Sequence, residues 1–253
     1  MALLNSLTTA VDPELALEAE VRSLNAQYDG ADAQAVLRAA VREQYPGDVA
    51  MVSSFGADSA VLLHMVAEID PKTPVVFIDT GKLFPATLRY RDELVERLGL
   101  TDVRSQKPDR EDLSDKDPAG MLWMNDTDAC CHIRKVLPLE VALDGFSAWV
   151  SGRKRFQSAT RAGLALFEAE AGRVKVNPLA GWSAGDVLDY AKAHDLPPHP
   201  LVAQGYPSIG CLPCTDKVKP GEDPRAGRWR GQDKTECGIH LPTHGREIDG
   251  SGI

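Results

Sequence analysis

The feature that most constrains the fold of this chain is a regular alternation between short apolar runs and longer amphipathic runs. Apolar runs lie at 48–56, 73–81 and 148–154, and segments with apolar residues at helical spacing separate them. Strands that alternate with helices form parallel sheets whose two faces are covered by helices. We therefore predict an α/β fold with a parallel sheet flanked by helices. In such folds, ligands bind outside the carboxyl ends of the strands.

Helical patterns also precede and follow this unit. Two amphipathic helices are predicted over 13–28 and 31–45. A further helix is predicted over 183–194, where Ser183 can cap the first turn and Asp186 lies at the third helical position. After Pro197 the Pro, Gly and charge content rises. The sequence thus divides into N-terminal helices (1–44), an α/β domain (45–214) and an irregular C-terminal arm (215–253).

The charge balance limits the classes of partner. The chain has 28 Lys and Arg against 37 Asp and Glu, and a net charge of −9 argues against a nucleic-acid or anionic-membrane surface. An anionic ligand would need a local cluster of cations. No targeting segment is evident, and no run approaches the roughly 18 apolar residues that span a bilayer. We expect a soluble, cytoplasmic protein with no membrane and no nucleic-acid partner.

Five cysteines, an odd number, argue against a disulfide framework and for metal binding or redox chemistry. Two close pairs, Cys130 with Cys131 and Cys211 with Cys214, could enclose one metal centre, either zinc or an iron–sulfur cluster. Adjacent cysteines favour a cluster, because zinc ligands usually have two to four residues between them. Buried, inert thiols are the third interpretation. Lys135 lies on the helical face of Cys131, where its ammonium could lie between the sulfurs and an anion.

Small, polar and basic residues follow the predicted strands. The turn at 53–59 precedes a helix, so its N–H groups could bind an anion, although a simply capped turn has the same composition. It lacks the Gly-Lys-Ser/Thr ending of a Walker A loop. Arginine suits phosphate or sulfate oxygens, but any single one can be a solvated side chain. Basic residues gather at two places: Arg153, Lys154, Arg155 and Arg161 after a strand, and Arg225, Arg228 and Arg230 near the end of the chain.

The fifth cysteine, Cys237, lies in a tail with almost no apolar periodicity, so a core role is not expected. Gly238 beside it allows another molecule to approach the backbone, and His240 three residues later can favour the thiolate. A reactive thiol is the interpretation we favour, with an incidental exposed cysteine as the alternative.

Taken together, these motifs resemble the cluster-containing branch of the APS/PAPS reductase family, the assimilatory adenylyl-sulfate reductases. The turn at 53–59 resembles the phosphate-binding loop of adenine-nucleotide hydrolase-like enzymes, with Ser54-Phe55-Gly56 where that loop has a glycine pair. The other motifs are IDTGKLFPAT, CCHIRKVLPL, GCLPCT, GRW and KTECGIHLP, in the order of the family. The similarity runs from about residue 45 to 242.

The resemblance implies an adenine-nucleotide alpha hydrolase-like fold and a reduction of adenosine 5'-phosphosulfate (APS) to sulfite and AMP, in assimilatory sulfate reduction and cysteine biosynthesis. Cys237 would be the nucleophile, with His240 and Lys135 assisting, and thioredoxin or a glutaredoxin-like protein would be the reductant. Homo-oligomer formation is left open. The ligands of a [4Fe-4S] cluster would be Cys130, Cys131, Cys211 and Cys214. The substrate-binding residues would be Ser53, Ser54, Gly56, Asp58, Ser59, Asp79, Thr80, Gly152, Arg161, Arg225 and Arg228.

Three other functions compete with this expectation. A PAPS reductase would differ by a 3'-phosphate on the substrate. A tRNA-thiolating enzyme would require an intact Ser-Gly-Gly loop and a basic surface, and the sequence has neither. In a non-catalytic iron–sulfur sensor, the four paired cysteines would matter and Cys237 would not.

Overall fold

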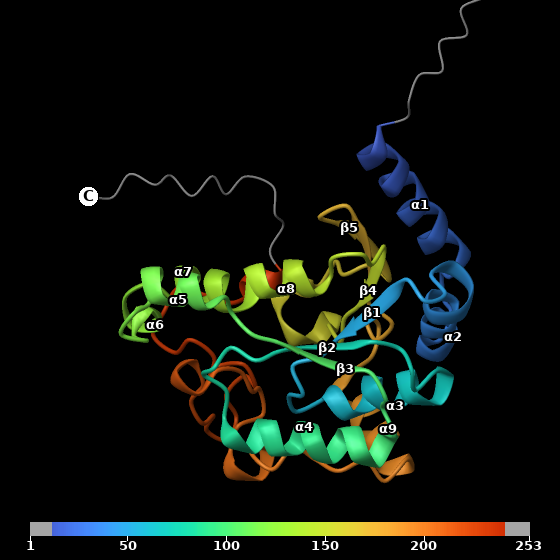
Figure 1. Ribbon diagram of the computed structural model, residues 1–253. Coiled ribbons are helices and arrows are strands. Elements are labelled where there is room, and N and C mark those ends of the chain that lie inside the picture. The colour runs from blue at the N-terminus through green and yellow to red at the C-terminus, as the bar shows by residue number, and fades with distance from the viewer. Residues whose placement is uncertain (1–11, 241–253) are drawn as a thin grey trace, which may run out of the picture.

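The computed structural model describes residues 12–240, and its centre is a six-stranded sheet (Figure 1). The strand order is β3-β2-β1-β4-β6-β5, and all neighbours are parallel except β5, which runs antiparallel to β6. The predicted α/β fold is confirmed, but the sheet is mixed rather than wholly parallel. The strands are β1 (Val49–Val52), β2 (Val75–Ile78), β3 (Val103–Gln106), β4 (Ala148–Val150), β5 (Phe167–Glu170) and β6 (Arg173–Val176).

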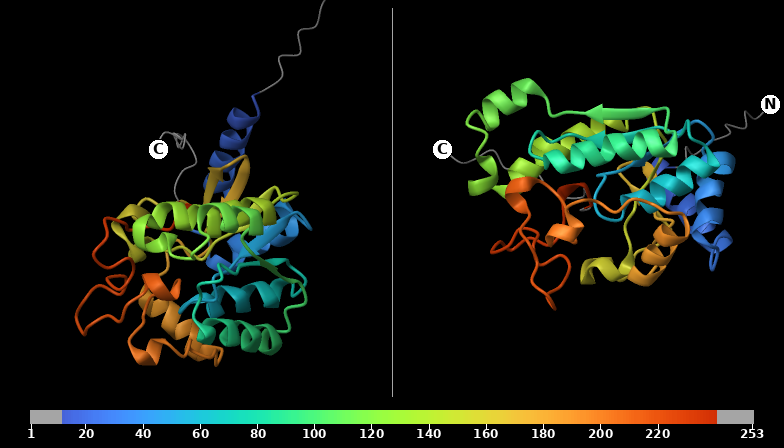
Figure 2. Two further views of the ribbon diagram at one scale, coloured as in Figure 1. Left: turned by 60° about the vertical axis from the view of Figure 1, so that its left-hand side comes forward. Right: turned by 90° about the horizontal axis from the view of Figure 1, so that it is seen from below.

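Helices cover both faces of the sheet (Figures 1 and 2). The row α5 to α8 lies on one face, and α3, α4 and α9 lie on the other. The helix predicted over 31–45 forms, but its second half is π-helical, as is the turn after α7. The helices are α1 (Pro13–Gln27), α2 (Ala33–Arg38), α3 (Ser59–Ile69), α4 (Pro85–Leu98), α5 (Arg110–Lys116), α6 (Leu122–Asn125), α7 (Thr127–Cys131), α8 (Leu137–Ala142) and α9 (Ala184–Ala193), with π-helical η1 (Ala39–Gln44) and η2 (His132–Val136).

Local sequence explains where helices begin and end. Ser183 caps α9 as predicted: its Oγ accepts a hydrogen bond from Asp186 N at 3.2 Å, and Asp186 Oδ2 accepts one from Ser183 N at 2.7 Å. Pro85 stands at the start of α4, and Gly99 ends that helix with φ +63°.

Alternate residues of each strand enter two separate cores. On β1, Val49 and Met51 face the larger core with α2, α3 and α4, whereas Ala50 faces a smaller core with α8. Trp149 of β4 belongs to this smaller core. Ile239 of the C-terminal arm packs against the same cluster, so the arm reaches the sheet despite its lack of apolar periodicity.

Within residues 12–240, the arm is a series of turns that ends in a short 3-10 turn, η7 (Gly238–His240). Residues 241–253 of the predicted arm and 1–11 of the N-terminal segment lie outside the described residues, and the division into three parts remains a prediction. No helix in the described part of the chain is both long and apolar enough to cross a membrane.

Candidate active site

A crevice is expected where the strand order reverses direction, at the carboxyl ends of β1 and β4. The chain moves from β1 to β2 on one side and later returns to β4 on the other, so the loops after β1 and β4 diverge. The first of these loops joins the second through an ion pair of 3.2 Å between Asp58 Oδ2 and Lys154 Nζ. The polar residues that the sequence places at strand ends therefore do gather at one edge.

The turn after β1 keeps a tight shape without a glycine pair. Phe55 has φ +47°, which is uncommon for a residue with a side chain. Its ring is fully buried and lies edge-on to Phe77, with centroids 5.4 Å apart, which holds the backbone in place. Ser53 Oγ accepts a hydrogen bond from Phe55 N at 3.2 Å. Ser53 is thus committed to the shape of the turn.

The other predicted substrate residues lie on neighbouring segments. Asp79 Oδ1 accepts a hydrogen bond from Gly81 N at 3.1 Å and shapes the loop after β2. Lys154 Nζ donates to the carbonyl of Gly152 at 3.1 Å. Burial lowers the pKa of Lys154, and the nearby Asp58 carboxylate offsets part of this effect. Ser54 and Gly56 stand in the turn, and Ser59 begins α3.

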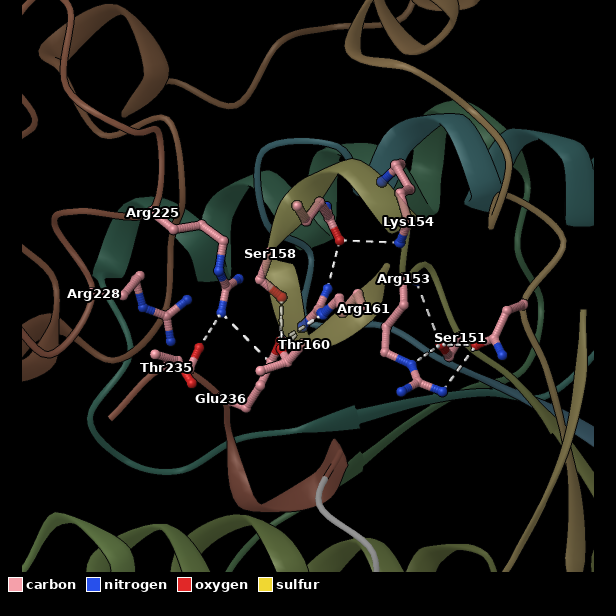
Figure 3. Close-up of polar contacts among 12 residues, drawn as sticks. Ser151, Arg153, Lys154, Ser158, Thr160, Arg161, Arg225, Arg228, Thr235 and Glu236 are labelled. Carbon is pink, nitrogen blue, oxygen red and sulfur yellow. Dashed lines mark hydrogen bonds and ion pairs between the residues drawn. The ribbon is translucent and has the colours of Figure 1, made fainter. Parts of the chain in front are cut away.

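Arg161 and Arg225, predicted to bind substrate, contact a carboxylate of the same chain (Figure 3). Arg161 donates from Nε and Nη2 to the two oxygens of Glu236, both at 2.7 Å. Arg225 Nη2 lies 3.6 Å from Glu236 Oε2. Burial alone would raise the pKa of Glu236, but the two guanidinium groups outweigh it and hold this pKa below its usual value.

The two cysteine pairs line one small cavity. Cys130, Cys131 and Cys211 are buried and Cys214 is half-buried. Burial raises the pKa of the Cys130 and Cys214 thiols. The remaining lining residues are Lys82, Trp123, Arg134, Lys135 and Pro213.

An ion pair holds the helix of the first cysteine pair in place. Arg134 donates from Nη2 to Asp117 Oδ2 at 2.6 Å and from Nη1 to the carbonyl of Thr80 at 2.9 Å. Both side chains of this pair are more than nine-tenths buried. The hydroxyl of Thr80, predicted to bind substrate, lies 3.3 Å from the Cys211 sulfur.

The donor set around this cavity fits an iron–sulfur cluster, which needs thiols spaced around a cavity, as the four cysteines are here. A cluster with four thiolate ligands is also negatively charged, and Lys82, Arg134 and Lys135 supply the opposite charge.

Cys237 lies against the cavity rather than out in solvent. Gly238 suits this approach, because a β-carbon there would lie only 3.0 Å from Val136 Cγ2 of η2. The Cys237 pKa is lowered by a hydrogen bond with Cys131 and by the positive charge of Lys135, against the effect of burial. Burial disfavours charge on Lys135, but the neighbouring thiolates of Cys237 and Cys211 outweigh it and raise its pKa.

Two polar atoms near this thiol are buried and lack a hydrogen-bond partner among the described residues, Arg228 Nε and His240 Nδ1. The Arg228 guanidinium lies over the Trp229 ring, 4.4 Å from its centroid. Burial, together with the charges of Lys175 and Arg153, lowers the pKa of His240. Buried polar atoms without a partner beside a thiol are suited to a polar ligand.

The structure adds residues that sequence reasoning missed. Arg134 and Asp117 form a buried ion pair beside the first cysteine pair, and Glu236 pairs with Arg161. Arg134 lies between Cys131 and Lys135 in the CCHIRKV motif, and Glu236 lies directly before Cys237. Their closeness in sequence to predicted site residues was the signal that could have indicated them. Their partners are 17 and 75 residues away in sequence, and no local pattern connects them.

The fold and site define an α/β protein of the adenine-nucleotide alpha hydrolase fold, with a thiol-lined cavity beside the loop that follows β2. The family model described as "Phosphoadenosine phosphosulfate reductase domain" matches residues 48–217. The chain belongs to this family of APS/PAPS reductases.

Named relatives agree with this assignment. The chain is 52% identical to "Adenosine 5'-phosphosulfate reductase" of Mesorhizobium japonicum, over 91% of each protein. It is 45% identical to the protein of that name from Staphylococcus haemolyticus, over 78% of this chain and 82% of the other. Its fold is similar to the phosphoadenylyl-sulfate (PAPS) reductase of Candida auris, with a TM-score of 0.67, 27% identity and coverage of 79% and 97%. An FMN adenylyltransferase of Candida glabrata shares the fold alone, with a TM-score of 0.54, 17% identity and coverage of 89% and 86%.

Proposed function

We propose that this protein catalyses the thiol-dependent reduction of APS to sulfite and AMP through an S-sulfonate on Cys237, in assimilatory sulfate reduction. The observation that carries the proposal is the meeting of Cys237 with Lys135 at the thiol-lined cavity. The names of the relatives support the substrate.

Separate groups of residues would bind the nucleotide and the sulfate of APS. The loops after β1, β2 and β4 would bind the nucleotide, through Ser53, Ser54, Gly56, Asp58, Ser59, Asp79, Thr80 and Gly152. Within residues 12–240, Lys135 and Arg228 form no ion pair with a carboxylate, so their charge is available to sulfate oxygens. Arg161 and Arg225 would add donors that Glu236 does not occupy, and His240 would offer its buried nitrogen.

The reaction proceeds in two transfers. The Cys237 thiolate attacks the sulfur of APS, and a bond forms between Cys237 Sγ and that sulfur. The bond from the sulfur to the bridging phosphate oxygen breaks, and AMP leaves. A thiol of thioredoxin or a glutaredoxin-like protein then attacks Cys237 Sγ, and sulfite leaves with the electron pair of the S–S bond. A second thiol of the reductant releases Cys237 from the mixed disulfide. The dithiol is oxidised by two electrons and the sulfur is reduced by two.

A [4Fe-4S] cluster would be held by Cys130, Cys131, Cys211 and Cys214. When bound, it would supply a fixed negative centre beside Lys135 and join the α7 helix to the segment at 211–214. The thiols supply all the electrons of the reaction. As a cluster ligand, Cys131 would be a thiolate and could no longer donate a hydrogen bond to Cys237. Lys135 would then be the main group that lowers the Cys237 pKa.

One experiment tests the chemistry at Cys237. Anaerobically purified protein is incubated with APS and no reductant, and the protein is then digested and examined by mass spectrometry. We expect one AMP per site and an added mass of about 80 Da on Cys237, which thioredoxin removes as sulfite. Cys237→Ser should keep AMP binding and form no sulfite.

An added mass on another cysteine, or turnover by Cys237→Ser, would contradict the proposal. No sulfonation by APS but sulfonation by PAPS would favour a PAPS reductase, and none by either would favour a sensor.

A further inference from the structure

The carboxylate of Glu236, the residue before Cys237, has hydrogen-bond or ion-pair partners at both of its oxygens. It is 7% exposed, and five contacts reach its two oxygens (Figure 3). In addition to both bonds from Arg161 and the ion pair with Arg225, Oε1 accepts hydrogen bonds from Ser158 Oγ at 3.0 Å and Thr160 Oγ1 at 3.2 Å. The segment at 158–161 thus converges on one side chain of the arm.

Other contacts hold the part of the arm that precedes this carboxylate. Arg225 Nη2 donates to the carbonyl of Thr235 at 2.8 Å. Lys234 pairs with Asp128 of α7, and Gln232 Oε1 accepts a hydrogen bond from Thr127 Oγ1 at 2.6 Å. The contacts of Gln232 and Lys234 therefore lie on the α7 side, and within residues 12–240 the hydrogen bonds between the arm and the segment at 158–161 all end on Glu236. Cys237 follows directly.

Glu236 does not exhaust the donors of the two arginines. Arg161 uses Nε and Nη2 for the carboxylate and Nη1 for Gln157 Oε1 at 2.5 Å, and a guanidinium has five N–H bonds. Arg225, itself in the arm, contacts Thr235 and Glu236 through Nη2. The carboxylate therefore fixes the orientation of both guanidinium groups while it leaves donors free for an anion.

We propose that Glu236 is a positioning residue that holds Cys237 over the site by anchoring the arm to Arg161 and the segment at 158–161. The proposal rests on the proposed function only for the identity of the reaction that Cys237 performs. A thiol displaced by about 1 Å can lose about 100-fold in rate, so one carboxylate can control the transfer without contacting the substrate. Its loss should slow sulfonation and leave nucleotide affinity nearly unchanged, and it should release the arm.

The test compares Glu236→Gln with a matched variant, Glu222→Gln, in cluster-loaded full-length protein. Glu222 lies in the same arm and pairs with Arg230 at 3.0 Å, away from the thiol. For Glu236→Gln we expect sulfonation at saturating APS to slow by about 10- to 100-fold, with the Kd for AMP within about threefold of wild type. Glu222→Gln should match wild type in both measurements.

A second measurement needs no substrate. Iodoacetamide reacts with the Cys237 thiolate, so the rates are compared at a pH where the thiol is fully ionised in both variants; they then report exposure of the arm, and mass spectrometry locates the modified cysteine. Glu236→Gln should react at least about fivefold faster than Glu222→Gln. The double variant Ser158→Ala/Thr160→Val removes two hydrogen bonds and no charge, and should change the rate in the same direction by less. It also serves as the test if Glu236→Gln does not fold.

Two results would overturn the proposal. Equal alkylation rates in Glu236→Gln and Glu222→Gln would show that the carboxylate does not hold the arm. A loss of AMP affinity as large as the loss in sulfonation rate would show that Glu236 acts on nucleotide binding. If wild-type protein forms no S-sulfonate at all, the proposed function fails, while the alkylation comparison still decides the role of Glu236.

Discussion

Gly210 lies directly beneath the guanidinium of Arg228. A β-carbon at Gly210 would lie 2.5 Å from Arg228 Cζ, far inside van der Waals contact. The guanidinium is also stacked on Trp229 and donates from Nη1 to the carbonyl of Ile209 at 3.3 Å. The glycine before Cys211 therefore sets the position of a cation that we propose for sulfate binding.

Gly210→Ala should displace that guanidinium without unfolding the protein, because the atom that must move is the end of a flexible side chain. We expect kcat/KM for APS to fall by about tenfold, or about 1.4 kcal/mol, and Arg228→Ala to lose at least as much. Steady-state kinetics with each variant measures this. Gly163→Ala is the control, since a β-carbon at Gly163 would meet no atom within 4 Å. A loss in Gly163→Ala equal to that in Gly210→Ala would contradict this account.

Cys211→Ser and Cys214→Ser should remove bound iron and activity together, because these ligands also hold the nearby segments of the protein in place. Purified wild-type protein should contain about four irons and four sulfides per chain. Cys237→Ser should retain both, and elemental analysis with visible absorbance distinguishes the variants. Stoichiometric zinc without iron in the wild-type protein would show that the cluster assignment is wrong.

Substrate preference should favour APS strongly over PAPS. The prediction rests on the paired cysteines, which accompany APS in the family that the sequence resembles, and on the names of the relatives. The ratio of kcat/KM for the two nucleotides decides it. A tenfold preference for PAPS, about 1.4 kcal/mol in transition-state binding, would reverse the assignment.

His199 should make the protein less stable in mild acid. It is 1% exposed, its Nε2 lies 3.1 Å from Thr87 Oγ1, and its Nδ1 accepts a hydrogen bond from Leu201 N at 3.1 Å. Burial lowers its pKa to about 4, from 6.5. Because the folded pKa is below the unfolded one, the stabilisation is complete above pH 6.5 and is lost as the pH falls toward 4.

His199→Gln measures this contribution. The stability advantage of wild type over the variant should shrink by about 2 kcal/mol between pH 7.5 and pH 5, as followed by urea unfolding at both values. Thr87→Val loses the partner of the ring but keeps the titrating group, so its pH dependence should remain that of wild type. An advantage of His199 over Gln that does not change with pH would contradict the assigned pKa.

Sequence patterns predicted most of the fold and the candidate site residues, but not the contacts among those residues. The βα alternation depends on residues a few positions apart, and the cap at Ser183 lies within one turn. The chemistry of the cysteine pairs follows from residue type and spacing. By contrast, the β5–β6 hairpin has two strands of four residues each, interrupted by charged side chains, and periodicity does not reveal strands of that kind.

The sequence by itself determined the α/β fold, the two cysteine pairs and the separate tail cysteine, because local propensity and donor chemistry follow from residue type and spacing. Tertiary structure alone decided that Phe55 holds a turn with positive φ through its buried ring, and that the hydroxyl of Thr80 lies beside the Cys211 sulfur. It also decided that Glu236 meets Arg161 across 75 residues. Such pairings arise from how the whole chain closes on itself, since either partner could be a solvated charge until the fold removes water from both.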